Sequence, residues 1–191
     1  LMARGDSQST PQDKIDFGLL KNSTNFLTGD IDTESVDKII KWIVYENSIQ
    51  SKKPITLYIN STGGSLSDAF ALIEVIRNSK RVVRTVGLGS IMSSAFLIFV
   101  SGAKGHRYIA KTTSILCHQY FDEIEGKFHD IHSYHKECEN NSQRMIDILV
   151  SATEFTRQEI KELLLPPTDI WLSSNELIQF GLADRYLEEL K

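Results

Sequence analysis

The sequence contains little cysteine and no long apolar run. Two cysteines in 191 residues, Cys117 and Cys138, are too few for a disulfide framework and fit a reducing compartment. No apolar stretch approaches the roughly 18 residues that span a bilayer, and Ala95–Val100 reads as a short buried helix. The N-terminus lacks a basic region followed by a hydrophobic block, so no secretion signal is expected. These absences predict a cytoplasmic protein without a membrane anchor.

A strong charge of one sign is also missing. The formal net charge is -4, which gives no reason to expect affinity for nucleic acid. Apolar residues make up 41% of the chain and charged residues 24%, the balance of a soluble globular protein. The length suits one domain with a substantial core. We expect a polar, flexible arm over residues 1–14 and a single domain over 15–191.

Strands and helices alternate through the first hundred residues. Asp32 or Thr33 is expected to cap a helix whose apolar residues recur at helical spacing from Val36 to Val44. The expected strands are Phe26–Thr28, Ile55–Ile59 and Val82–Val86; the residues Asn60–Ser65 are expected to form a turn, with further helices through 69–76 and 93–100. This order predicts an α/β fold with right-handed crossovers.

The second half of the chain has a different pattern. Arg107–Ile109 and Thr113–Cys117 read as strands, and the alternating character of Tyr120–Phe128 predicts an extended hairpin. Asp130–Thr153 predicts a long helix that is polar on most sides and projects from the core. A partner subunit is the simplest explanation for such an arm.

Ser93 is the first candidate for chemistry. It follows Gly87–Met92, a strand that ends in small residues, and it opens a helix. A hydroxyl at a helix N-terminus lies beside N–H groups that favour developing negative charge, as an oxyanion hole requires. A serine in this position more often only caps its helix, and the pattern alone favours capping.

Two further features strengthen the catalytic interpretation. Gly63 and Gly64 follow a strand and allow close approach of backbone to a ligand, although such pairs are also common in plain turns. His118 follows the apolar run Ile115–Cys117 and should lie at a strand end, where a lone histidine is more often structural. Together they supply a nucleophile, a base and oxyanion donors on successive strand ends.

These segments closely resemble the ClpP family of caseinolytic peptidases. The matching stretches run in order from about Leu19 to Tyr186, and the 25-residue step from Ser93 to His118 matches the family's spacing. They are Leu57–Ser65, Gly89–Leu97, Gly102–Tyr108, His118–Gln119, Asp169–Ser173 and Phe180–Asp184.

The resemblance implies a crotonase-like α/β core with a protruding strand-helix handle. It implies Ser93 as nucleophile, His118 as general base and Asp169 as the group that orients the histidine. Backbone N–H groups of Gly64 and Ser94 would form the oxyanion hole. Neither a metal nor an organic cofactor is implied.

The resemblance also implies an assembly and a substrate class. Subunits would form heptameric or tetradecameric rings that enclose the active sites and degrade unfolded polypeptides through an acyl-enzyme. An ATPase of the AAA+ class would deliver the substrates. The three histidines His129, His132 and His135, with Cys138, drift around a helix and read as a solvated face, so no metal is expected there.

Two segments depart from the family pattern. After His118-Gln119 the family usually carries proline and a glycine-rich strand, whereas this chain has Tyr120–Gly126, and two extra residues precede Asp169. A catalytically silent subunit of a mixed ring therefore stays open as an alternative. Two others are an acyl-CoA enzyme of the same fold and a processing protease such as one acting in capsid maturation.

Overall fold

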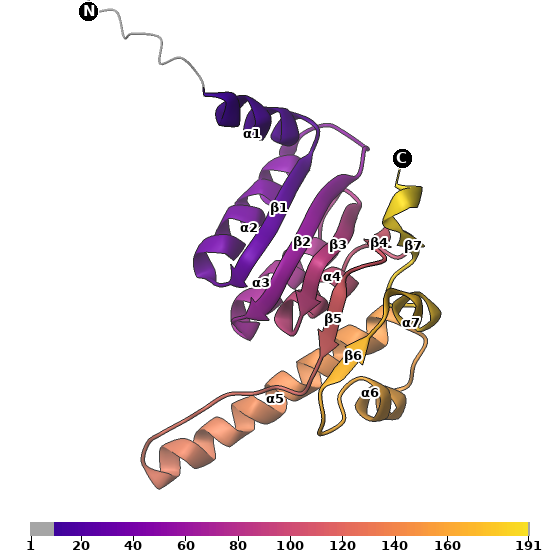
Figure 1. The fold of residues 1–191 in the computed structure, drawn as a ribbon. Helices are drawn as coiled ribbons and strands as arrows, with labels where there is room; N and C mark the ends of the chain where they lie inside the picture. Colours follow the sequence, from indigo (N-terminus) through magenta and orange to yellow (C-terminus); the bar gives the residue numbers. More distant parts are fainter. Residues whose placement is uncertain (1–9, 191) are drawn as a thin grey trace, which may run out of the picture.

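The computed structural model describes residues 10–190, which form one seven-stranded sheet with helices around it (Figure 1). The strands are β1 (Thr24–Ile31), β2 (Ile55–Gly64), β3 (Val83–Met92), β4 (Arg107–Ile109), β5 (Ser114–Cys117), β6 (Ile170–Leu172) and β7 (Arg185–Tyr186). The helices are α1 (Pro11–Lys21), α2 (Thr33–Ser48), α3 (Leu66–Arg77), α4 (Ser94–Val100), α5 (Phe128–Ala152), α6 (Arg157–Leu163) and α7 (Ser174–Gln179), and a final 3-10 turn covers Leu187–Glu189.

The sheet is predominantly parallel, as the βα alternation predicts. Its order is β1-β2-β3-β4-β7, and β5 also pairs with β3 beyond the end of β4. The one antiparallel pair joins β5 to β6. The carboxyl ends of β2, β3 and β5 therefore meet at one edge of the sheet, and this edge carries the candidate active site.

Local sequence explains where the first helices begin. Asp32 caps α2, accepting a hydrogen bond from the Ser35 N–H, so the expected cap is confirmed. Helix α1 begins at Pro11 behind a capping box made by Thr10 and Asp13. The expectation of a flexible arm is thus wrong for residues 11–14, and the rest of that arm, residues 1–9, lies outside the described residues.

The expected turn at Asn60–Ser65 is also corrected. Strand β2 continues through Gly64, because Gly64 still pairs with Ile31 of β1 and Ser61 pairs with Ile91 of β3. Positive φ angles at Gly63 and Gly64 let the strand bend while it remains paired. This extension carries the two glycines beside the end of β3.

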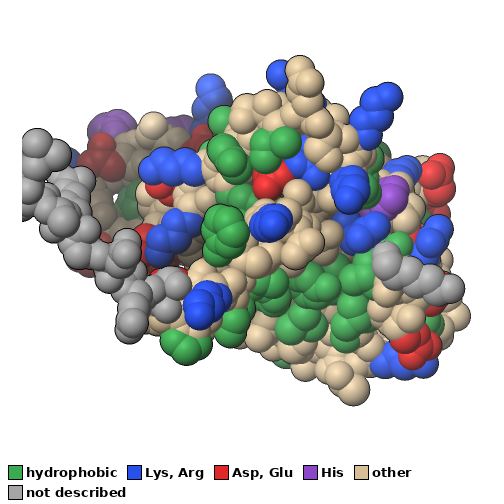
Figure 2. Space-filling view, turned by 90° about the horizontal axis from the view of Figure 1, so that it is seen from above, with side chains coloured by type: hydrophobic (Ala, Val, Ile, Leu, Met, Phe, Trp, Pro, Cys, Tyr) green, Lys and Arg blue, Asp and Glu red, His purple; other side chains and the backbone are tan. Residues whose placement is uncertain are grey.

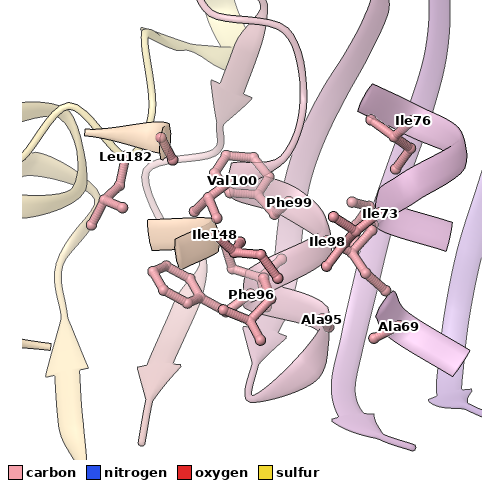
Figure 3. Packing of buried hydrophobic residues seen from close by; sticks show 14 of the residues in the cluster. Ala69, Ile73, Ile76, Ala95, Phe96, Ile98, Phe99, Val100, Ile148 and Leu182 are labelled. Carbon is pink, nitrogen blue, oxygen red and sulfur yellow. The ribbon is translucent and has the colours of Figure 1, made fainter. Parts of the chain in front are cut away.

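Helix α4 lies at the centre of the core. Every one of its residues is buried, so the apolar run of Ala95–Val100 is an internal helix, as expected. Figure 3 shows Phe96, Ile98 and Phe99 between α3 on one side and Ile148 of α5 on the other. Full burial of side chains this large stabilises the fold by about 1.5–3 kcal/mol each. The helix that begins beside Ser93 is therefore held rigidly.

Helix α5 forms the expected projecting handle. Its buried residues all lie at or beyond Met145, and the preceding part extends away from the sheet (Figure 1). The predicted hairpin at Tyr120–Phe128 is wrong: residues 118–127 contain no strand and make a single pass along α5. Because this segment has no neighbouring strand, its backbone cannot form the hydrogen bonds of a hairpin. Within the segment, the Phe121 side chain is 74% exposed.

Part of the surface is apolar. Figure 2, seen from the end of the sheet where β1 to β3 begin, shows hydrophobic side chains gathered in a continuous patch. Large exposed apolar side chains occur on α1, on β1 and on α2, among them Phe17, Phe26 and Tyr45. Within residues 10–190, no helix combines the length and the apolar character needed to cross a membrane.

Candidate active site

Ser93 occupies the junction between β3 and α4 in a strained conformation. Its φ is 55° and its ψ is -126°, which is unusual for a residue other than glycine. Its backbone N–H donates to the Leu116 carbonyl of β5 at 3.0 Å, and this bond fixes the junction against the neighbouring strand. Its hydroxyl makes no capping bond to α4, so the side chain does not serve as the helix cap. Strain of this kind clusters at functional sites.

The Ser93 hydroxyl instead meets His118. The distance from Ser93 Oγ to His118 Nε2 is 2.8 Å, and both residues are half-buried. On the other side of the ring, His118 Nδ1 lies 2.5 Å from the Gln119 carbonyl oxygen. A carbonyl can only accept, so Nδ1 carries the proton and Nε2 is left to accept from Ser93. This is the tautomer that a general base requires.

Asp169 lies on the strand next to His118, and no hydrogen bond between the two is found within the described residues. The antiparallel register of β5 and β6 ends at Cys117 and Ile170, so His118 and Asp169 are the next residues on the two strands. The Asp169 side chain is exposed, and within the described residues no hydrogen bond joins it to His118. The structure therefore brings Ser93 and His118 together and leaves Asp169 beside them.

Backbone from β2 packs directly against Ser93. A Cβ added at Gly63 would lie 2.8 Å from Ser93 Cβ and 3.3 Å from Ser93 Oγ. A Cβ at Gly64 would lie 2.4 Å from the Ile31 carbonyl oxygen, and its φ is +146°. Both positions thus require glycine. Ser94 is 2% exposed, and its hydroxyl has no hydrogen-bond partner within the described residues.

One cavity connects these groups. It measures about 440 Å³, and Ser93, His118, Gly64 and Ser94 all line it. The opposite wall comes from the 119–122 segment and from α5; it includes Tyr120, Asp122, Tyr134, Glu137, Asn141, Arg144 and Met145. A volume of this size accommodates several residues' side chains or a small ligand.

Several residues around the site were not predicted from the sequence. The sequence places Gly63 only in an expected turn, whereas in the structure a Cβ at Gly63 would overlap Ser93. Asn60 accepts from the Ser90 N–H at 2.9 Å and braces the end of β3. Gln119 donates to the Leu165 carbonyl at 2.8 Å, which ties the residue after His118 to the loop preceding Asp169. For Asn60 the sequence does offer a signal, because this amide stands three residues before Gly63-Gly64; for Gln119 the only signal is its place directly after His118.

Cys117 is unsuited to act as a nucleophile. It precedes His118 but is buried, and burial raises the pKa of its thiol far above the ordinary value. The thiolate, which is the reactive form, is therefore scarce at neutral pH. Its place in the core is consistent with packing.

Together these features define an α/β protein with a serine–histidine pair in one cavity with glycine backbone, an arrangement typical of acyl-transfer enzymes. The model of the Clp protease family matches residues 7–189. The chain is 30% identical over 165 residues to the ATP-dependent Clp protease proteolytic subunit 2 of Treponema denticola, covering 86% of this chain and 82% of that one.

Two further relatives agree. The ATP-dependent Clp protease proteolytic subunit 1 of Chlamydia muridarum is 30% identical over 188 residues, which is 97% of both chains. The corresponding subunit of Borrelia garinii subsp. bavariensis is 30% identical over 169 residues, with 88% of this chain and 86% of that one covered. The chain belongs to the Clp protease family. The crotonase-like α/β fold expected from the motifs is confirmed, and the acyl-CoA enzyme finds no support.

Proposed function

We propose that the protein is a serine endopeptidase subunit in which Ser93 is the nucleophile and His118 the general base. The observation that carries this proposal is the 2.8 Å contact between Ser93 Oγ and His118 Nε2 at the edge of a cavity. The strained backbone at Ser93 and the absence of a capping bond support it further, because they remove the structural explanation for the serine.

The reaction follows from the positions of these groups. His118 Nε2 takes the Ser93 proton as Oγ attacks the peptide carbonyl, and the negative charge that develops on the carbonyl oxygen is stabilised by the N–H groups of Gly64 and Ser94. The C–N bond breaks as His118 returns the proton to the leaving amine. Water, deprotonated by His118, then attacks the acyl-enzyme carbonyl, the ester bond to Oγ breaks and Ser93 recovers its proton.

Asp169 has the role of orienting His118 in this proposal. In the present arrangement the Gln119 carbonyl accepts from Nδ1, and Asp169 lies on the adjacent strand. A carboxylate stabilises the imidazolium form better than a carbonyl does. Exchange of the Gln119 carbonyl for the Asp169 carboxylate as the acceptor of the Nδ1 proton would complete a triad.

We propose further that subunits assemble into closed rings and that an AAA+ ATPase supplies unfolded polypeptides. The relatives are named as proteolytic subunits of ATP-dependent proteases. The projecting half of α5 and the apolar patch of Figure 2 are surfaces that one chain alone leaves uncovered. A ring would confine cleavage to chains that can enter it.

A catalytically silent subunit is the second candidate, and it is favoured because the Gln119 carbonyl, rather than Asp169, accepts from His118 Nδ1. The test is degradation of a fluorescently labelled unfolded protein by the purified chain, with Ser93→Ala as control and native mass spectrometry to determine assembly. Cleavage by the assembled wild type alone supports the peptidase. The silent subunit is supported if the assembled wild type degrades the substrate no faster than Ser93→Ala, both alone and with an added AAA+ ATPase.

A further inference from the structure

The wall of the active-site cavity opposite Ser93 carries an anionic group that the proposed mechanism does not use. This group is Asp122, in the segment that runs along α5. The Asp122 side chain is exposed to solvent, and it lines the same cavity as Ser93 and His118. A substrate that fills this cavity from Ser93 therefore shares the cavity with the Asp122 carboxylate.

Three neutral donors hold the Asp122 carboxylate in place. Tyr120 Oη donates to Oδ2 at 2.6 Å, Tyr134 Oη donates to the same oxygen, and the Glu123 N–H donates to Oδ1 at 2.9 Å. Hydrogen bonds from Tyr120, Tyr134 and Glu123 hold the pKa of Asp122 below its ordinary range. The group is ionised at neutral pH, and none of its three partners supplies a positive charge.

The other charged groups of the cavity compensate each other. Arg144 donates to Glu137 Oε1 at 2.7 Å and to Asn141 Oδ1 at 2.7 Å, and its guanidinium lies 5.8 Å from the centre of the Phe70 ring. Among residues 10–190, the charged side chains that line the cavity are Asp122, Glu137 and Arg144. With Glu137 and Arg144 paired, the cavity retains one uncompensated negative charge.

We propose that Asp122 gives the enzyme a preference for peptides with a lysine or arginine side chain next to the scissile bond, an inference that rests on the proposed peptidase function. An ammonium or guanidinium in the cavity gains a charge-assisted hydrogen bond to a carboxylate that is already oriented. An acidic side chain meets repulsion instead. Tyr120 and Tyr134 are positioning residues, because they hold the carboxylate and need not touch the substrate.

The test separates binding from catalysis by using Ser93→Ala protein, which cannot cleave. Fluorescence anisotropy is recorded with labelled pentapeptides that have lysine, norleucine or glutamate at the central position. Norleucine matches the lysine stem without its charge. We expect the lysine peptide to bind about 5- to 10-fold more tightly than the norleucine peptide at low salt, with glutamate weakest. The difference should shrink as ionic strength rises.

Asp122→Asn in the same background should abolish the difference between lysine and norleucine. Glu125→Gln is the matched control, since it removes one negative charge from the same segment at a position that does not line the cavity. It should keep the preference. Equal binding of the lysine and norleucine peptides, no binding of the lysine peptide at about 1 mM, or the same loss in both variants overturns the proposal.

Labelling of wild-type Ser93 by a fluorophosphonate tests the peptidase function separately. Labelling without a lysine preference refutes only the role of Asp122. A lysine preference that Asp122→Asn abolishes, in a protein that is not labelled, supports the binding site and refutes the peptidase function.

Discussion

Replacing Gly63 by alanine places a methyl group against the proposed nucleophile. The added Cβ would lie 2.8 Å from both the Met92 carbonyl oxygen and Ser93 Cβ, and these distances are shorter than ordinary van der Waals contact. Gly63 also has φ +102°, which costs an L-residue about 1–2 kcal/mol. Relief of the overlap requires β2 or the Ser93 junction to move, at a further cost of about 1–3 kcal/mol.

The expected result is a loss of about 2–5 kcal/mol in the free energy of unfolding, measured by urea denaturation. Fluorophosphonate labelling of Ser93 should slow by about 100-fold, because a displacement near 1 Å is enough to misalign reacting groups. Both effects arise from one contact, so they should appear together.

Gly105→Ala is the matched control. Gly105 has φ +84°, and a Cβ built there meets no atom within 4 Å. This variant has the backbone cost alone, about 1–2 kcal/mol, and should be labelled at the wild-type rate. If Gly63→Ala loses no more stability than Gly105→Ala and labels equally fast, then Gly63 does not position Ser93 and the reasoning is refuted.

Three other substitutions separate the roles assigned above. Ser94→Ala removes a buried hydroxyl that has no hydrogen-bond partner within the described residues, so the free energy of unfolding should stay the same or rise slightly. The labelling rate should stay within about threefold of wild type, because the proposed oxyanion donor is the backbone N–H of Ser94. A drop of about 100-fold would instead assign the hydroxyl a catalytic role. Asp169→Asn should slow labelling by about 100-fold or more if Asp169 orients His118, whereas an unchanged rate would assign that role to the Gln119 carbonyl. Asp184→Asn should lower the free energy of unfolding by about 2–3 kcal/mol at pH 7, measured by urea denaturation, because it leaves the buried Arg107 guanidinium without its carboxylate.

The Asp184 variant also has a defined pH dependence. Burial works to raise the pKa of Asp184, but its hydrogen bonds and charge interaction with Arg107 together outweigh burial and hold that pKa below the ordinary value. Because the pKa of Asp184 is lower in the folded state than its ordinary value of about 4, the ionised carboxylate stabilises the folded protein at pH values above about 4. This stabilisation is lost as the pH falls through the folded-state pKa. Wild-type stability should therefore fall more steeply than that of Asp184→Asn between about pH 5 and pH 3; parallel curves would contradict the assignment.

The sequence predicted the elements that local pattern determines. The cap at Asp32, the buried helix of Ala95–Val100 and the long helix α5 all follow from spacing and composition. Helix α1 is not among the elements expected from the sequence, although its capping box, Thr10 with Asp13, is visible there, because the surrounding polar composition favours an arm. In this helix the local capping signal outweighs the polar composition.

The errors of longer range have a different origin. The continuation of β2 to Gly64 depends on pairing with Ile31 and with β3. The sequence of residues 60–64 alone does not indicate which other strands they pair with. The expected hairpin at Tyr120–Phe128 failed for the complementary reason, since alternation does not supply a neighbouring strand. Tertiary pairing decides both cases.

The candidate site shows the same division. Motif spacing identified Ser93 and His118, and the structure brings their side chains into contact. Which atom accepts the hydrogen bond from His118 Nδ1 depends on the rotamer of His118 and on the path of the chain after β5. A sequence motif specifies neither. The contacts of Asp122 with two tyrosines likewise require the segment to lie along α5.

The central claim is that His118 activates Ser93. The most direct measurement is the rate of fluorophosphonate labelling of the assembled wild type, Ser93→Ala and His118→Ala between about pH 5 and pH 9. The account predicts that only the wild type is labelled rapidly at every pH in this range and that labelling maps to Ser93. Equal labelling of the wild type and His118→Ala, or labelling that survives Ser93→Ala, would contradict it.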